Sequence, residues 1–220
     1  MFRILGINDV RRVAERAVRT ISANRKHNSK VRNSDSEESL IRIQPDAFVQ
    51  VWLLNGYHTN AYRQTRLMWD YLRGEDFIAP TDGQVSNGKP WFMASSKGSY
   101  FDLGYCLPGG RYCVAYAHTY IHAASASDAH LWIGSSDGVK VWVNGKIVWI
   151  NDSYRQHTQG EDKVDVCLLA GWNRLLVKIS QGRGKWGFSL AICNSDGDAV
   201  QNLVYCLYPP SEETMPDAIS

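Results

Sequence analysis

Residues 139–150 read VKVWVNGKIVWI, two runs of apolar and β-branched residues on either side of the dipeptide Asn144-Gly145. Asn-Gly is a strong hairpin signal, because a two-residue β-turn needs a positive φ at both central residues. Such a turn fixes which residues face each other across the two strands. We therefore expect Val143 opposite Lys146, and each further pair to follow in step as far as Val139 opposite Ile150.

The two faces of this hairpin differ in composition. One face carries branched aliphatic side chains, which are typical of a buried core: Val139, Val141, Val143, Val148 and Ile150. The other face carries Trp142, Ile147 and Trp149 with Lys140. Two interpretations fit the tryptophan face. It is an exposed aromatic platform, or it is buried under another segment, such as the one around Trp69 or the N-terminal arm.

The rest of the chain after Leu40 repeats this pattern of short β runs. Clusters of Gly, Asn, Asp and Pro separate the runs, and one segment, residues 62–72, fits a helix. Many short strands without alternating helices predict an all-β fold, an antiparallel β-sandwich of the jelly-roll type, over residues 40–209. The β runs outside the hairpin are residues 48–54, 112–122, 131–133, 164–169, 174–180, 186–192 and 203–208.

The two ends of the 220-residue chain differ from this body. Within residues 1–39, an apolar stripe with arginines on the opposite face precedes a polar stretch, which predicts a short basic amphipathic helix and a linker. We expect residues 210–220 to form a flexible tail. Lys and Arg exceed Asp and Glu in residues 1–40, whereas the remainder is slightly acidic, so charge does not support a nucleic-acid partner. No apolar run approaches the ~20 residues of a transmembrane helix.

Two glycine-rich stretches match known motifs but not the structural context that the motifs need. Residues 134–138, GSSDG, match a nucleophile elbow, and residues 182–187, GRGKWG, match a Gly-x-Gly-x-x-Gly phosphate loop. Both motifs require a helix after the glycines, whereas a β run follows here. The sequence shows neither a convincing carboxylate pair nor a zinc-like cysteine spacing. We therefore expect no catalytic residue, no metal site and no cofactor.

The order of motifs along residues 48–206 resembles a known family. It runs from FVQVWLLNGY (48–57) through GKPWF (88–92) to GSSDGVKVWVNG (134–145) and AGWNRLLVK (170–178). This order resembles the galactose-binding-domain-like jelly-roll modules appended to secreted bacterial glycoside hydrolases. The hairpin is also similar to the sugar-binding domains named after anthrax protective antigen, in which an Asp-Asp pair ligates calcium. Here the pair is Ser136-Asp137, with one carboxylate instead of two, so the resemblance carries over no calcium ligand to this chain.

The resemblance implies non-catalytic binding of a polysaccharide or oligosaccharide by an accessory module. Sugar rings have apolar C–H faces that stack on aromatic side chains, and Trp142 and Trp149 are the candidate platform. Tyr154, Arg155 and His157 follow the hairpin and are candidates for hydrogen bonds to hydroxyls or to an acidic sugar. The resemblance further implies an attached glycoside-active catalytic domain and an extracellular or periplasmic location, while a cytoplasmic location stays open.

Two alternatives remain at this point. The first is a structural or protein-docking β-sandwich that has no sugar ligand and meets a partner through its aromatic face. The second is an enzyme acting on polysaccharides, whose site would draw on Tyr116, His118, Tyr120 and Arg155. The first three share one face of their β run with His122, which makes that face a second candidate platform.

Overall fold

The computed structural model describes residues 47–59, 67–108 and 110–208. The predicted N-terminal helix and linker (1–39) and the tail (210–220) lie outside these residues, as does most of the helix expected at 62–72. Residues 67–72, the described part of that segment, form turns and bends, so the helix prediction is wrong there. Within the described residues, helix is limited to α2 (Leu103–Cys106) and the 3-10 turn η2 (Glu75–Phe77).

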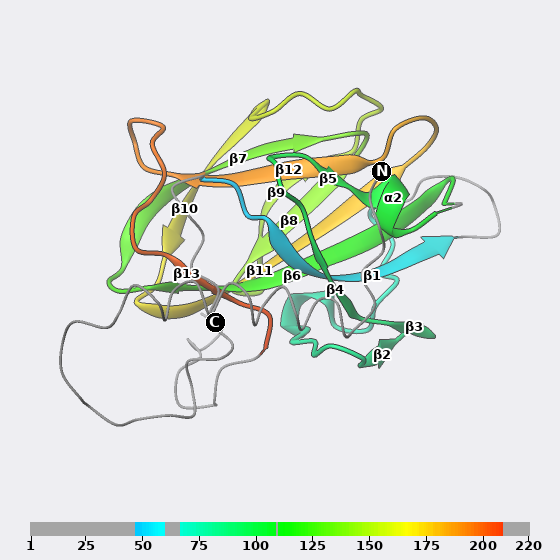
Figure 1. Cartoon of the computed structure of the whole chain (residues 1–220), viewed down its shortest axis with the longest axis horizontal. Coiled ribbons are helices and arrows are strands. Elements are labelled where there is room, and N and C mark those ends of the chain that lie inside the picture. Colours follow the sequence, from blue (N-terminus) through cyan, green and yellow to red (C-terminus); the bar gives the residue numbers. More distant parts are fainter. Residues whose placement is uncertain (1–46, 60–66, 109, 209–220) are drawn as a thin grey trace, which may run out of the picture. The chain divides into compact units, whose positions relative to one another are not determined.

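Two antiparallel sheets pack face to face, which confirms the predicted all-β sandwich (Figure 1). The strand order of the larger sheet is β4-β1-β6-β11-β8-β9, with β13 also paired to β6. Its strands are β1 (Val51–Thr59), β4 (Phe92–Ser95), β6 (Cys113–Ala123), β8 (Val139–Val143), β9 (Lys146–Asn151), β11 (Gly171–Gln181) and β13 (Val204–Cys206). The smaller sheet has the order β10-β7-β12-β5, from β10 (Asp162–Leu168), β7 (Ser127–Ser135), β12 (Gly187–Cys193) and β5 (Phe101–Asp102).

The main core lies between the two sheets, where alternate residues of each strand point inward. Along β6, every odd-numbered residue from Cys113 to Ala123 except Thr119 belongs to this core, whereas Val114 and Tyr116 belong to the cluster on the opposite side of the larger sheet. Trp52 of β1 packs edge-on against Phe188 of β12, with ring centroids 5.2 Å apart. The inward valines of β8, expected from the sequence to be core, belong to the same cluster.

The predicted hairpin forms, but its register slips after two pairs. Asn144 (φ 51°) and Gly145 (φ 80°) adopt the expected positive φ values, and Val143 and Trp142 pair with Lys146 and Ile147 as predicted. A β-bulge then shifts the pairing by one residue, so that Val141 faces Trp149 and Lys140 faces Ile150. The register predicted beyond Ile147 is therefore wrong: Trp149 moves to the core side, and Ile150 moves to the outer side.

A second apolar layer covers the outer face of the larger sheet. Residues 67–91, which we call the cover segment, connect β1 to β4 and include the short strands β2 (Val85–Ser86) and β3 (Lys89–Pro90). In Figure 1 this segment, in teal, lies on the side of the larger sheet away from β7 and β12. Its side chains pack with outward-facing residues of β1, β6, β8 and β11 in one buried cluster, which includes Leu53, Leu72, Trp91, Tyr116, Trp142 and Leu176.

Candidate functional site

Buried ionic contacts attach the cover segment to the sheet. Glu75 of η2 is 6% exposed, and its Oε1 accepts hydrogen bonds from Lys178 Nζ, at 2.9 Å, and from the Tyr116 hydroxyl. Lys140 Nζ lies 3.9 Å from the other carboxylate oxygen. Burial lowers the pKa of Lys178, an effect that Glu75 opposes, and burial together with Glu75 raises the pKa of Tyr116. The cluster thus places one buried carboxylate between two buried lysines inside an apolar layer.

Trp142 belongs to the same attachment and is not a sugar platform in this structure. Its indole Nε1 donates a 2.7 Å hydrogen bond to Asp76 Oδ1, and the residue is 1% exposed. Arg174 donates to the backbone carbonyls of Asp76, at 3.0 Å, and Phe77, at 2.9 Å, which holds η2 over the ring. Of the two interpretations of the tryptophan face, burial is therefore correct for Trp142, because the cover segment supplies the missing layer.

The alternative aromatic face on β6 is buried at three of its four positions. Tyr116, His118 and Tyr120 are each 0% exposed, so a polysaccharide has no access to them. His122 is half-buried and packs edge-on against Trp172. The His118 ring lies edge-on to Trp91 and Tyr120, and burial lowers its pKa to about 3. These side chains form part of the packing beneath the cover segment.

Trp149 is half-buried and packs against the edge of the inter-sheet core. The bulge in β9 causes this position, since it turns Trp149 away from the face on which the sequence placed it. Trp142 and Trp149 consequently lie on opposite faces of the sheet and do not form one platform.

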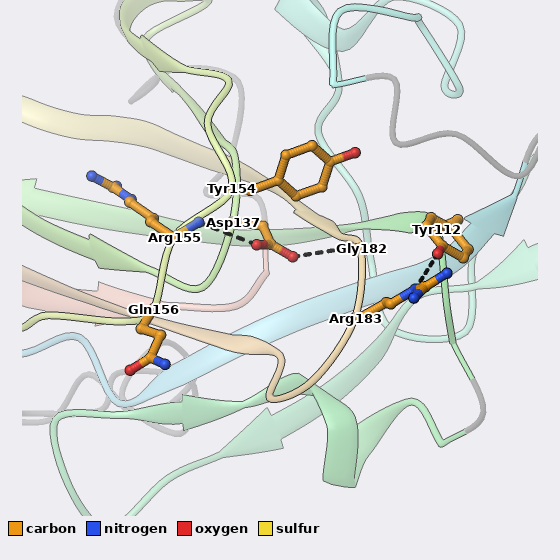
Figure 2. Close-up of a pocket in the computed structure, with 7 residues that line it drawn as sticks. All are labelled: Tyr112, Asp137, Tyr154, Arg155, Gln156, Gly182 and Arg183. Atoms are coloured by element: carbon orange, nitrogen blue, oxygen red, sulfur yellow. Dashed lines mark hydrogen bonds between the residues drawn. The ribbon is translucent and has the colours of Figure 1, made fainter.

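A hollow of about 600 Å³ opens where several inter-strand loops meet (Figure 2). It includes two of the predicted site residues, Tyr154 and Arg155, which lie between β9 and β10. The remaining wall comes from the residues before β6, the β7–β8 turn and the β11–β12 loop. The full lining is Tyr112, Asp137, Tyr154, Arg155, Gln156, Gly182 and Arg183.

Asp137 links three of these loops through hydrogen bonds. Its Oδ2 accepts the Gly182 N–H at 2.7 Å and its Oδ1 accepts the Arg155 N–H at 3.3 Å, while its own N–H donates to the Arg155 carbonyl at 2.9 Å. Both carboxylate oxygens therefore already accept backbone hydrogen bonds. In the described part of the chain, no group of three or more His, Cys, Asp or Glu side chains is arranged to hold a metal ion.

Arg155 directs its guanidinium away from Arg183 (Figure 2). The group forms a two-pronged pair with the Asp162 carboxylate, with Nη1 3.1 Å from Oδ1, and Nη2 donates to Ser135 Oγ at 2.8 Å. Burial raises the pKa of Asp162, but the hydrogen bonds and charge of Arg155 outweigh that effect and hold the pKa below its usual value. Arg155 thus stabilises the wall of the hollow through its contacts with Asp162 and Ser135.

His157, the fifth predicted site residue, points elsewhere. Its Nε2 lies 2.8 Å from Ser189 Oγ, and its ring packs edge-on against Tyr100 at 4.7 Å between centroids. Burial lowers its pKa, and the nearby Arg155 charge acts in the same direction. It is not one of the residues that line the hollow.

Tyr154 presents the exposed ring of the hollow, with 73% of the residue exposed. The ring lies against the backbone of Gly182, where a Cβ atom would come within 2.7 Å of its Cε1. On the other side of the hollow, Arg183 Nε donates to the Tyr112 hydroxyl, and its guanidinium lies 5.6 Å from the centroid of that ring. Sequence reasoning missed Tyr112 and Arg183; the available signal was an arginine within the glycine-rich loop at 182–187.

Comparisons with known proteins found no matching family model and no matching curated protein. Among solved structures, the chain is similar to an anti-sigma factor domain-containing protein, at 14% identity and a TM-score of 0.45 over 77% of this chain and 50% of that one. A β-glucosidase from Kluyveromyces marxianus in complex with glucose matches at 11% identity and a TM-score of 0.39, over 77% of this chain and 19% of that one. The PA14 domain of the antifreeze protein MpAFP matches at 13% identity and a TM-score of 0.36, over 73% and 70%.

At these identities the similarity concerns the β-sandwich fold alone. The chain spans half the length of the anti-sigma factor domain-containing protein and about a fifth of the β-glucosidase. Among the residues that the structure describes, no helix has the length and apolar character needed to cross a membrane.

Proposed function

We propose that this domain binds carbohydrate without converting it, and that the hollow at the loop end of the sandwich is its binding site. The observation that carries the proposal is the exposed Tyr154 ring, held against Gly182 and facing an open hollow that also contains a guanidinium. An aromatic ring beside fixed polar donors suits a sugar, which has apolar C–H faces and a polar rim. Covering about 100 Å² of apolar surface supplies roughly 2–3 kcal/mol, which, with a few hydrogen bonds, fits micromolar to millimolar affinity.

The chemistry of the hollow supports binding rather than glycoside hydrolysis. Hydrolysis by the common mechanism uses two carboxyl groups on either side of the scissile bond. Asp137 is the one carboxylate among the lining residues, and backbone N–H groups occupy both of its oxygens. We infer an accessory role, with a polysaccharide or oligosaccharide as the partner and an extracellular or periplasmic location, as the sequence resemblance implies.

Substitution of Tyr154 tests this proposal. In isothermal titration calorimetry against glycans selected on an array, we expect Tyr154→Ala to weaken binding about tenfold or more, because about 1.4 kcal/mol of stacking corresponds to tenfold in Kd. Tyr208→Ala removes another exposed tyrosine, 44% exposed on the segment after β13, and should leave the affinity unchanged. No glycan binding by the wild-type chain, or equal binding by Tyr154→Ala, would contradict the proposal.

A protein-docking role is the second candidate, because large apolar side chains are exposed next to the hairpin tip. Phe77 is 68% exposed and Ile147 is 42% exposed, and Arg174 holds the Phe77 carbonyl beside β8 and β9. If docking is the function, the chain should bind no glycan, and Phe77→Ser should weaken its association with itself or a partner in analytical ultracentrifugation.

A further inference from the structure

Charge in the hollow is unevenly compensated. Three lining residues carry formal charge: Asp137, Arg155 and Arg183. Backbone N–H groups satisfy Asp137, while Asp162 and Glu161 neutralise Arg155, with Glu161 Oε2 3.2 Å from Nη1. Arg183 is exposed, and no carboxylate of the described residues lies within ion-pair distance of it. The hollow therefore contains one cation without an acidic partner in the described chain.

The orientation of Arg183 is set by Tyr112. The Tyr112 hydroxyl accepts a hydrogen bond from Arg183 Nε, which places the guanidinium beside the hydroxyl end of the ring, 5.6 Å from its centroid. No hydrogen bond to a described residue uses the two terminal nitrogens, Nη1 and Nη2. A planar guanidinium held at Nε presents these nitrogens as a fork, which matches the oxygens of a carboxylate or a sulfate.

The tyrosine and the arginine lie within one site. In Figure 2 the Tyr154 ring extends toward the side of the hollow on which Tyr112 and Arg183 lie. Two further exposed cations, Arg111 and Lys185, flank Tyr112 and Arg183 in the chain, and neither pairs with a described carboxylate. Clustered positive charge raises the local concentration of an acidic polymer and speeds its association.

We propose that the hollow selects an acidic saccharide, whose carboxylate or sulfate binds the Nη1 and Nη2 groups of Arg183 while the sugar ring packs on Tyr154. Tyr112 is the positioning residue that holds the guanidinium. This inference rests on the proposed carbohydrate-binding function and adds the class of ligand.

The test compares acidic ligands with neutral ligands built on the same sugars. Calorimetry with the full chain, in EDTA and at low salt, would use oligogalacturonate, its methyl ester as the neutral match, and a sulfated galactan oligosaccharide beside unsulfated galactan. We expect oligogalacturonate, the sulfated oligosaccharide or both to bind at least about tenfold more tightly than the neutral match. Arg183→Gln should remove this preference by weakening binding of the acidic ligand far more than that of the neutral one. Lys146→Gln is the matched control for a lost exposed charge, because Lys146 lies at the Asn144-Gly145 turn, at the opposite end of β8 from Asp137.

Tyr112→Phe separates positioning from a general structural role. It removes the hydroxyl that orients Arg183 but keeps the ring, so affinity for the acidic ligand should fall several-fold, with no change for the neutral one and no change in melting temperature. Equal affinity for charged and neutral ligands, or an equal loss of both in Arg183→Gln, would overturn the inference while the proposed function stands. Absence of binding to every glycan would overturn both.

Discussion

At the scale of single residues, Glu75 is the side chain on which the cover segment most depends. It is the carboxylate partner of Lys178, which is fully buried, and of the Tyr116 hydroxyl. A buried charge whose partner is removed is strongly destabilising, because the remaining charge has lost both water and its counter-ion. The same residue keeps η2 over Trp142 and so explains why that tryptophan is not available to a ligand.

We expect Glu75→Gln to lower the free energy of unfolding by about 3–5 kcal/mol, as breaking one side of a buried pair does. Urea denaturation followed by tryptophan fluorescence measures this change. Glu161→Gln is the control, because its pair with Arg155 is partly exposed and should contribute less than about 1 kcal/mol. Equal, small losses in both variants would show that the buried cluster does not hold the cover segment in place.

At the scale of elements, the hairpin shows what sequence patterns can and cannot predict. Asn144-Gly145 predicts the turn and the first two pairs, because turn geometry is encoded by the turn residues themselves. The bulge at Val148 has no comparable local signal, and it reverses the faces of Trp149 and Ile150. Burial of Trp142 beneath the segment around Trp69 was one of two interpretations of the sequence. The sequence could not choose between them, because the deciding contact is with Asp76, which is 66 positions away.

The candidate site, too, could be predicted only where its residues lie close together in the sequence. Tyr154 and Arg155 could be predicted because they immediately follow the hairpin. Tyr112 and Arg183 are 71 positions apart, and the pairing of β6 with β11, which ends at Cys113 opposite Gln181, brings them together. Predicting that pair required the strand order, which short β runs do not reveal.

At the scale of the whole molecule, two buried histidines set the response of stability to acid. The neutral ring of His58 fits its neighbours, since Nε2 lies 2.7 Å from Asn55 Oδ1 and Nδ1 lies 3.4 Å from the amide nitrogen of Asn87. Burial, with the charges of Lys89 and Lys178, lowers its pKa to about 4. Burial, with the charge of Arg174, lowers the pKa of His118 to about 3.

Both histidines stay neutral in the folded chain at pH values where the unfolded chain binds their protons. The free energy of unfolding should therefore fall as the pH drops from 6.5 toward 4. In this interval the unfolded chain binds up to two more protons than the folded chain, which corresponds to a slope of roughly 3 kcal/mol per pH unit. Urea denaturation at successive pH values measures this slope. His118→Phe should reduce the slope by about half, because one of the two histidines is removed. A wild-type free energy of unfolding that does not change across this interval would contradict the role of the two histidines.

We propose that ligand binds at the hollow and not on the tryptophan faces of the sheet. A two-dimensional ¹H–¹⁵N NMR titration with oligogalacturonate tests it in one experiment, because it reports on backbone amides and indole N–H groups together. We predict that the amide signals of Tyr154, Gly182 and Arg183 move with added ligand, while the indole N–H of Trp142, bonded to Asp76, does not. Shifts centred on Trp142 and the cover segment, with the loop amides unmoved, would contradict the account.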